Sequence, residues 1–346
     1  MAMLVSLRKL LSACVYANLE ACQIIRQYYY HESSKDIRYK EEGDSRSVVT
    51  KADIDAQCKI INILRNQEPW GPHLHIIGEE DEESSTTTTT TTNEHESISN
   101  ILKQLSLQNE EDEIVPIDEL CIFIDPLDGT REFVENRIQN VGCLIGITRN
   151  GKAIAGTVGV PFPSTSNNSS PPAFIRYAYL NDDVIAGTWP HDETHNVNDK
   201  DDDDDGFTII YTGDSKNKIL SNVVQLAKQI ILQNNKNEVK HEIVGGTAAK
   251  LSLIATTKTT SSSMAILHVG TNVWDTVATE ALVRSQGGHV TDFLGRPLET
   301  HLHPSKIRNV YGVIASSKNA RTLHDELCQT IQQQADPTLL HQILNP

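Results

Sequence analysis

The segment that most constrains this chain is Ile122–Thr130, with the sequence IFIDPLDGT. Its first residues form a predicted apolar β-strand that runs directly into two carboxylates, Asp125 and Asp128, three positions apart. Pro126 has no N–H group and ends strand pairing, so the chain turns there. Both carboxylates and the Leu127 carbonyl oxygen can then converge on a hard divalent cation. Because all of these ligands are oxygen atoms, the pattern favours magnesium.

The two residues that end this segment suit a phosphate group. Gly129 lets the backbone approach a ligand closely, and Thr130 opens a short helix predicted over residues 131–135. Unpaired N–H groups at the start of a helix favour an anion, so metal and phosphate would meet at one place. The alternative interpretation is an ordinary Asx turn that caps a helix, and the local sequence does not separate the two.

Three other carboxylates border predicted elements in a way that would let them join this site. Glu79 follows an apolar strand predicted over residues 76–78. Asp275 stands at the start of a helix predicted over 275–285, and Asp53 precedes a helix predicted over 54–64. Taken alone, each has an ordinary alternative, because acidic residues after strands are usually solvated and aspartates at helix starts are usually caps. Asp53 either caps its helix or accepts a proton from a catalytic hydroxyl.

The composition excludes several classes of protein. The 346 residues include 30 Lys and Arg against 46 Asp and Glu, a net charge of −16 that disfavours nucleic-acid backbones and anionic bilayers. No apolar run approaches the roughly 18 residues of a membrane span. Six scattered cysteines lack any C-x-x-C pair, and the N-terminal residues predict an amphipathic helix to about Tyr30 instead of a signal peptide. These features favour a cytoplasmic protein.

The periodicity of the chain predicts two domains, an α+β metal-binding domain at 1–190 and an α/β nucleotide-side domain at 206–346. An acidic low-complexity insertion at 191–205 joins them, with eight acids and one lysine from Asp192 onward. Biased stretches at 84–92 and 164–172 are two further predicted surface insertions. The predicted strands are 120–125, 207–211, 264–269 and a hairpin of 141–148 with 152–160, and a further predicted helix is 217–232.

The carboxylate motifs occur in the order T-K-A-D, G-E-E-D, D-P-L-D-G-T and W-D-T, and the ordered set is far more specific than any member. It resembles the lithium-sensitive, magnesium-dependent phosphatases of the inositol monophosphatase superfamily over nearly the whole chain. The details that make the resemblance greatest to the bisphosphate nucleotidase branch are Arg131–Phe133, Glu280 and Val244–Gly246 with Lys250.

That resemblance implies an α/β fold, a layered α/β/α/β/α sandwich of the inositol monophosphatase and fructose-1,6-bisphosphatase type, with the active site between the domains. It implies removal of the 3′-phosphate from adenosine 3′,5′-bisphosphate (PAP) by metal-activated water, to give AMP and phosphate. The sulfated nucleotide PAPS is a second implied substrate. Two or three Mg²⁺ ions per site are expected, with inhibition by lithium.

The resemblance also implies a role for each motif residue. The magnesium ligands are Glu79, Asp125, the Leu127 carbonyl, Asp128 and Asp275. Asp53 and Thr130 form a proton-accepting dyad that orients the attacking water. The substrate contacts are Gly129, Thr130, Thr212, Ser215, Gly246, Lys250 and Asp275.

This chain departs from the pattern of that branch on the nucleotide side. Ser215 stands where the branch carries His, and Gly213-Asp214 stands where it carries Arg-Ser. The loss of a cation and the gain of an anion would weaken binding of a doubly phosphorylated nucleotide, unless Lys216 or Arg308 supplies the charge.

Two other functions remain open. One is an inositol polyphosphate 1-phosphatase or inositol monophosphatase, because the cations bind phosphate oxygens generically and substrate choice lies in the second domain. The other is a non-catalytic nucleotide or metal sensor, which would have lost a ligand or the dyad. The expected partners are small molecules, namely PAP, PAPS and inositol bisphosphates, with no nucleic acid and no membrane, for a monomer or homodimer.

Overall fold

The structure is a computed structural model that describes residues 3–31, 38–39, 48–80, 92–106, 113–163, 171–180, 185–189, 207–234, 238–257, 261–298 and 308–333. The predicted insertion at 191–205 and most of those at 84–92 and 164–172 lie outside the described residues.

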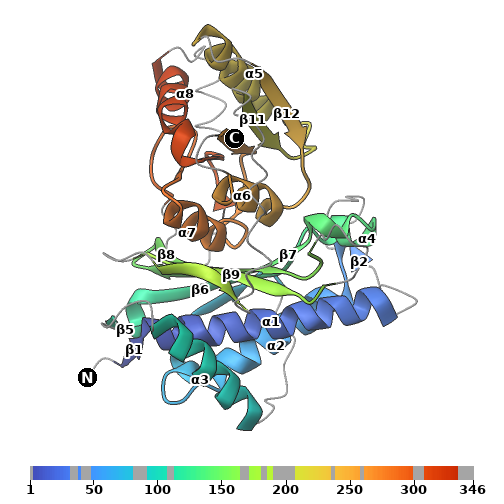
Figure 1. The fold of residues 1–346 in the computed structure, drawn as a ribbon, viewed down its shortest axis with the longest axis vertical. Helices are drawn as coiled ribbons and strands as arrows, with labels where there is room; N and C mark the ends of the chain where they lie inside the picture. The colour runs from blue at the N-terminus through green and yellow to red at the C-terminus, as the bar shows by residue number, and fades with distance from the viewer. Residues whose placement is uncertain are drawn as a thin grey trace.

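Helices and sheets alternate in five layers along the long axis of the molecule (Figure 1). The first layer holds α1 (Leu7–His31), α2 (Lys51–Arg65) and α3 (Thr92–Ser106). A six-stranded sheet follows, in the order β10 (Ile185–Trp189), β9 (Phe174–Tyr179), β8 (Lys152–Val160), β7 (Gly142–Arg149), β6 (Leu120–Asp128) and β4 (Ile76–Gly78). The middle layer holds α6 (Thr247–Ala255) and α7 (Val277–Ser285).

The second sheet has the order β12 (Val239–Ile243), β11 (Thr208–Thr212), β13 (Ser262–Leu267), β17 (Val313–Ser316) and β15 (His289–Thr291). The fifth layer holds α5 (Lys218–Gln233) and α8 (Arg321–Gln333). Smaller elements are α4 (Thr130–Val134) and the strand pairs β1 (Leu4–Ser6) with β5 (Ile114–Pro116), β2 (Arg38–Tyr39) with β3 (Val48–Val49), and β14 (Thr271–Asn272) with β16 (Arg308–Asn309). The predicted α/β/α/β/α sandwich is therefore confirmed.

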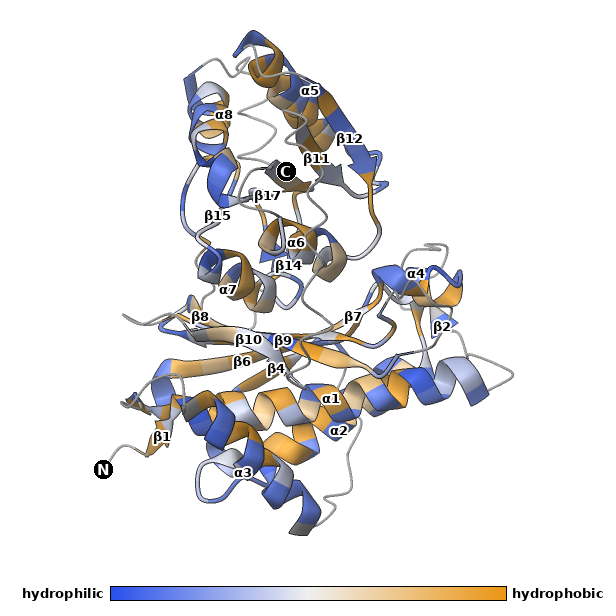
Figure 2. Cartoon of the chain, in the orientation of Figure 1, coloured by the Kyte–Doolittle hydropathy of each residue, from blue (hydrophilic) through white to orange (hydrophobic). Residues whose placement is uncertain are grey.

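Alternating side chains explain why each sheet is covered on both faces. In β6, Ile122 and Ile124 pack in the core shared with α1 and α2, whereas Cys121 and Phe123 pack on the opposite face. The same alternation divides β13, whose Met264 and Ile266 belong to the core of α5 and α8, while its intervening residues face α6 and α7. Figure 2 shows the apolar stripe of α1 beneath the first sheet. Strands buried on both faces read as continuous apolar runs.

The middle layer lies very close to the first sheet because that sheet carries glycines beneath it. A Cβ on Gly146 would lie 2.5 Å from the Val277 side chain, and one on Gly156 would lie 2.5 Å from the Ala278 Cα. The absence of side chains at both positions lets the α7 backbone approach the sheet directly. This close packing fixes the turn that precedes α7, which contains Asp275.

Most predicted elements are confirmed, with two differences that affect the site. β7 and β8 form the predicted antiparallel hairpin, and the predicted N-terminal helix is α1. α7 begins at Val277, so Asp275 lies in the turn before the helix and not in its first turn. α2 begins at Lys51, so Asp53 lies inside the helix. No helix of the described segments has the length and apolar character needed to cross a bilayer.

Glu280 in α7 generates a pH prediction. Burial raises the pKa of its carboxyl group to about 7, an effect that Arg284 opposes through an ion pair of 3.2 Å. The folded state then binds an extra proton between the unfolded pKa of 4.5 and about 7, so stability falls as the pH rises through this window. We expect Glu280→Gln to remove that fall, which amounts to at most about 3 kcal/mol. Urea denaturation from pH 4 to 8 measures it.

The matched control is Glu96→Gln on the exposed surface of α3, which removes the same charge without burial. Its stability curve should follow that of the unchanged protein at every pH. A Glu280→Gln curve parallel to the unchanged protein would show that Glu280 is ionised in the fold.

Candidate active site

Neighbouring strands bring the first two predicted ligands together. β4 pairs with β6 in parallel, with Gly78 opposite Ile124, so the residues that follow, Glu79 and Asp125, are neighbours. The Glu79 N–H donates to the Ile124 carbonyl at 3.0 Å, and the two acidic side chains are hydrogen-bonded. Two carboxyl groups in such contact need a proton or a cation between them.

Asp128 reaches from the end of β6 into the other half of the molecule. The prediction that strand pairing ends at Pro126 is wrong, because β6 continues to Asp128, which pairs with Gly142. The β6–β7 register shifts between Asp125 and Asp128, so the proline is accommodated in an irregularity of the ladder. The Asp128 carboxylate accepts the Thr247 N–H at 3.0 Å and the Ala248 N–H at 2.8 Å. These are the first residues of α6, so a carboxylate of the first sheet caps a helix of the middle layer.

Gly246 makes this contact possible. Its φ is +66°, and a Cβ there would lie 2.4 Å from the Asn140 carbonyl and 2.8 Å from an Asp128 carboxylate oxygen. Glycine adopts a positive φ at little cost and has no side chain to displace the carboxylate. Gly129, the other glycine predicted to contact substrate, has a φ of +84° and precedes α4. Both glycines lie against the carbonyl of Asn140, which closes the back of the loop.

Asp275 approaches from the turn between β14 and α7. Its carboxylate accepts the Asn272 N–H at 2.9 Å. Asn309 in β16 holds this turn, because its amide donates to the Asn272 carbonyl at 3.1 Å and to the Thr276 hydroxyl at 3.1 Å. The turn is thus fixed on both sides before any ligand binds.

The four acidic side chains influence one another's ionisation. Burial raises the pKa of Asp125, Asp128 and Asp275, and the charge of Glu79 raises each of them further. Lys250 opposes this at Asp128 and Asp275, while its own pKa is lowered because it is buried. Carboxylates kept this close gain from a cation, and their all-oxygen donor set fits a hard divalent ion.

The predicted ligands suit a divalent metal ion in their residue type and in their charge. Among the described residues, no three acidic, histidine or cysteine side chains already converge on one point as a finished metal shell does. In this arrangement the Asp128 carboxylate accepts two N–H groups of α6, and the Asp125 side chain is hydrogen-bonded to Glu79.

The predicted dyad is in contact. The Thr130 hydroxyl lies 2.9 Å from Asp53 Oδ1 and 3.1 Å from the Leu127 carbonyl oxygen. The other Asp53 oxygen accepts the Thr50 N–H at 2.8 Å and the Thr50 hydroxyl, which completes a capping box at the start of α2. Asp53 therefore takes part in the capping of α2 and also accepts a hydrogen bond from the Thr130 hydroxyl, and its part in catalysis stays a prediction. Burial raises the pKa of Asp53 to about 7, although the hydrogen bonds of Thr50 oppose the shift.

The residue one turn after Asp53 was missed by the sequence analysis. Gln57 donates from its amide to the Glu80 carbonyl at 2.7 Å and accepts the Glu80 N–H at 3.1 Å. α2 therefore fixes the dyad with one buried polar side chain and the turn after Glu79 with the next. A pair of buried polar residues four apart on one helix face is the signal that could have found it.

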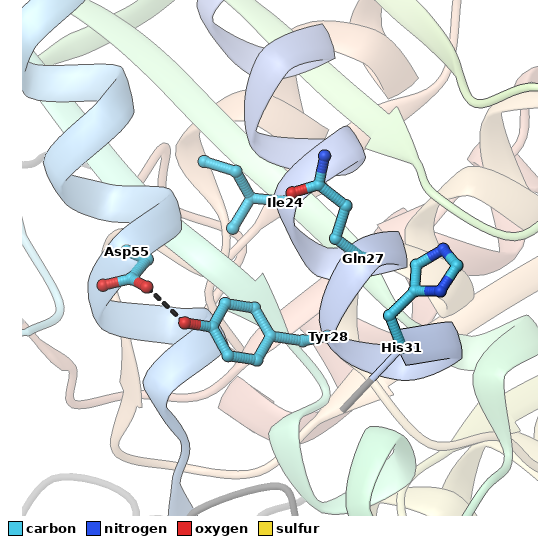
Figure 3. Close-up of a pocket in the computed structure, with 5 residues that line it drawn as sticks. All are labelled: Ile24, Gln27, Tyr28, His31 and Asp55. Atoms are coloured by element: carbon cyan, nitrogen blue, oxygen red, sulfur yellow. Dashed lines mark hydrogen bonds between the residues drawn. The ribbon is translucent and has the colours of Figure 1, made fainter. Parts of the chain in front are cut away.

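The outer face of α2 is tied to α1 in turn. Tyr28 of α1 donates a hydrogen bond to Asp55, and Lys51 donates to the same Asp55 oxygen at 2.5 Å. Figure 3 shows this contact in a pocket of about 500 Å³ that Ile24, Gln27 and His31 also line. The contact joins α1 to α2 two residues after Asp53.

The predicted nucleotide-side residues have varied surroundings. The Thr212 hydroxyl lies 2.9 Å from His241 Nε2 on β12, a contact that no sequence pattern indicated. Ser215 accepts the Asn217 N–H at 3.3 Å at the start of α5. Lys250 is buried and donates to the carbonyls of Val244 and Gly246, so much of its hydrogen-bonding capacity holds the glycine turn. The binding roles of these residues stay predictions.

A further ionic group beside the site is not explained by those roles. Glu132 accepts from Arg137 at 2.6 Å and 2.8 Å and from the Asn140 amide at 2.9 Å. A Cβ on Gly245 would lie 2.1 Å from the Glu132 carboxyl carbon, so this group lies directly against the glycine turn. Arg131, next to Thr130, forms an ion pair of 2.6 Å with Asp214.

Comparisons with known proteins agree with this arrangement. The sequence model of the inositol monophosphatase family matches residues 6–336 of this chain. The 3′(2′),5′-bisphosphate nucleotidase 1 of Dictyostelium discoideum is 29% identical over 319 residues, which cover 92% of this chain and 96% of that protein. The protein of the same name from Homo sapiens is 28% identical over 300 residues, covering 82% of this chain and 83% of its own length. The crystal structure of the extragenic suppressor protein suhB from Bartonella henselae shares the fold, with a TM-score of 0.58 at 19% identity, over 92% of this chain and 98% of that one.

The Gly246 contact predicts an asymmetry between two glycines near the site. We expect Gly246→Ala to lower the free energy of unfolding by at least about 1–2 kcal/mol, because alanine is strained at this φ and its Cβ would push Asp128 from α6. Gly213→Ala is the matched control, since the nearest atom to its Cβ is Lys250 Nζ at 4.0 Å. Urea denaturation of both variants measures the difference, and equal losses would contradict it.

Proposed function

The chain belongs to the inositol monophosphatase family, and from this premise we propose that it is a magnesium-dependent phosphatase that removes the 3′-phosphate from adenosine 3′,5′-bisphosphate. The relatives that share the name bisphosphate nucleotidase match most of the chain, which supports a nucleotide as the substrate. The structural observation that carries the proposal is the Thr130 hydroxyl, 2.9 Å from Asp53 and next to the carboxylate cluster.

The proposed magnesium ligands are Glu79, Asp125, Asp128, Asp275 and the Leu127 carbonyl. They come from both halves of the chain. Burial, and after it the charges of the neighbouring carboxylates, raises the pKa of the three aspartates. When bound, magnesium supplies positive charge for the phosphate oxygens and makes a water molecule more acidic. It would also provide the local positive field that a chain of net charge −16 needs to attract an anion.

The residues of the chain itself perform the proton movement. Asp53 is held by two hydrogen bonds from Thr50, so its free oxygen remains directed at Thr130. In its ionised form it accepts a hydrogen bond from the Thr130 hydroxyl, which leaves the Thr130 oxygen able to accept a hydrogen bond from water. The water is then oriented with a lone pair toward the phosphorus. As the water oxygen bonds to phosphorus, the water gives a proton to Thr130, Thr130 gives its own proton to Asp53, and the bond from phosphorus to the ribose 3′ oxygen breaks. The released 3′ oxygen takes a proton from solvent water to give AMP, and Asp53 returns its proton to solvent.

Substrate choice is assigned to the groups around α6. Thr212 ends β11, Ser215 lies in the loop after it, Gly246 precedes α6, and Lys250 lies within α6. We propose that these four residues contact the nucleoside part and its second phosphate, and that PAPS is a second substrate that binds through the same residues. The departure at Ser215 leaves inositol phosphates as the competing substrates, because the carboxylate cluster and dyad contain nothing specific to a nucleotide.

The proposed location is the cytosol. All six cysteines are free, and five of them are buried. Burial raises the pKa of the Cys14, Cys22 and Cys143 thiols, which keeps them protonated and unreactive. Free thiols of this kind suit a reducing compartment.

The first test measures phosphate release from adenosine 3′,5′-bisphosphate and inositol 1,4-bisphosphate side by side with magnesium. We expect release from the nucleotide, and we expect Asp125→Asn to abolish it because a ligand charge is lost. Chelation of the metal should abolish release as well, and lithium should inhibit it. Release from the inositol compound alone would support the inositol phosphatase alternative. Release of phosphate from neither compound would support the non-catalytic sensor.

The dyad has a separate test with a matched pair of variants. Thr130→Ser keeps the hydroxyl, whereas Thr130→Val keeps the shape and loses it. We expect Thr130→Val to lower kcat by roughly 10²–10⁴-fold, the usual contribution of a positioned proton acceptor, and Thr130→Ser to keep most of the rate. Full activity in Thr130→Val would contradict the dyad, and a large loss in Thr130→Ser with activity kept in Thr130→Val would show that the methyl group and not the hydroxyl is required.

A further inference from the structure

One ion pair at the site joins the two halves of the chain beside the dyad. Arg131 directly follows Thr130 at the start of α4, and Asp214 lies two residues after Thr212 at the end of β11. Arg131 Nη1 lies 2.6 Å from Asp214 Oδ2, and Arg131 Nε donates to Glu135 at 2.9 Å. Asp214 is one of the residues at which this chain departs from the pattern of the nucleotidase branch, together with Gly213 and Ser215.

Asp214 also acts on the buried lysine of the site. A Cβ on Gly213 would lie 4.0 Å from Lys250 Nζ, so the loop that carries Asp214 runs past this ammonium group. The charge of Asp214 raises the pKa of Lys250, as do those of Asp128 and Asp275, against the lowering by burial. The Asp214 carboxylate therefore lies near two cations that border the phosphate site.

The ion pair can be broken at little cost. The side chain of Asp214 is 61% exposed and that of Arg131 is 37% exposed. Exposed pairs of this kind contribute at most about 1 kcal/mol, and they exchange readily with solvent or with a stronger anion. A phosphate carries more charge than a carboxylate and offers more acceptor oxygens to a guanidinium group.

We propose that the Asp214 carboxylate pairs with Arg131 in the protein without substrate, and that the second phosphate of the substrate displaces Asp214 and pairs with Arg131 in its place. Arg131 is then a substrate-binding residue, and it supplies the positive charge that Ser215 cannot. Because Asp214 must leave for the phosphate to bind, it opposes binding of the doubly phosphorylated substrate. The inference rests on the proposed function, since it names the group that binds the second phosphate of that substrate.

The experiment compares two nucleotides that differ only in the second phosphate, namely adenosine 3′,5′-bisphosphate and adenosine 3′-phosphate. Their KM values are measured for the unchanged protein, Asp214→Asn, Arg131→Gln and the double variant. We expect Asp214→Asn to lower KM for the bisphosphate about three- to tenfold relative to KM for the monophosphate. Arg131→Gln should raise the same ratio, and Asp214→Asn should have no further effect in its presence.

The matched control is Asp118→Asn, which removes one exposed carboxylate elsewhere in the first half and so reports any effect of net charge alone. An equal change of KM for both nucleotides in Asp214→Asn would overturn the inference, because a contact with a structural role alone affects the two nucleotides equally. A higher KM for the bisphosphate in Asp214→Asn would overturn it too.

Equilibrium binding of the same two nucleotides to Thr130→Val, followed by calorimetry, separates this inference from the proposed function. Binding that favours the bisphosphate and strengthens when Asp214→Asn is added supports the inference even if the unchanged protein releases no phosphate. In that case the proposed function alone fails. Turnover of both nucleotides without a preference for the bisphosphate would agree with the proposed function and overturn the inference. Binding of neither nucleotide would overturn the proposed function and the inference together.

Discussion

The contact on which the site depends is that of the Asp128 carboxylate with the first N–H groups of α6. It links the end of the first sheet to the middle helical layer, and it is formed by two hydrogen bonds of 2.8 Å and 3.0 Å. The helix N-terminus favours a negative charge there, so Asp128 remains suited to ionisation although burial opposes it. The packing of α7 on Gly146 and Gly156 of the first sheet is a second link between the two halves, and it positions the turn that carries Asp275.

A second constraint is the concentration of negative charge between the two halves. Burial and mutual repulsion raise the pKa of three aspartates, and Lys250 offsets only part of the repulsion. Lys250 itself is fixed by the carbonyls of the glycine turn, so it cannot swing toward each carboxylate in turn. Such an arrangement costs stability in the absence of a cation and strengthens the binding of one, which is how binding sites for hard ions are built.

The sequence predicted those features that depend on short spacing. The strand, turn and carboxylates of β6 lie within nine residues, and the hairpin of β7 and β8 follows from a local turn. The cap that Asp128 makes on α6 could not be predicted, because its partners lie far along the chain and depend on how two sheets pack. The contact of Thr212 with His241 depends in the same way on the pairing of β11 with β12. The roles of Lys216 and Arg308 as substitute cations stay predictions, whereas Arg131 directly follows Thr130 of the dyad.

The net charge of −16 also has a physical interpretation once the site is described. Exposed charges are screened beyond roughly 8 Å at physiological ionic strength, so the acidic insertion at 191–205 has little influence on a phosphate unless it lies close to the site. What an incoming anion encounters is the local set of charges, in which the carboxylates of Glu79, Asp125, Asp128 and Asp275 repel it and Arg131, Lys250 and any bound cation attract it. Asp214 lies beside this set and neutralises part of its positive charge through the ion pair with Arg131. One carboxylate at this position therefore matters more for the binding of an anionic substrate than an exposed carboxylate far from the site.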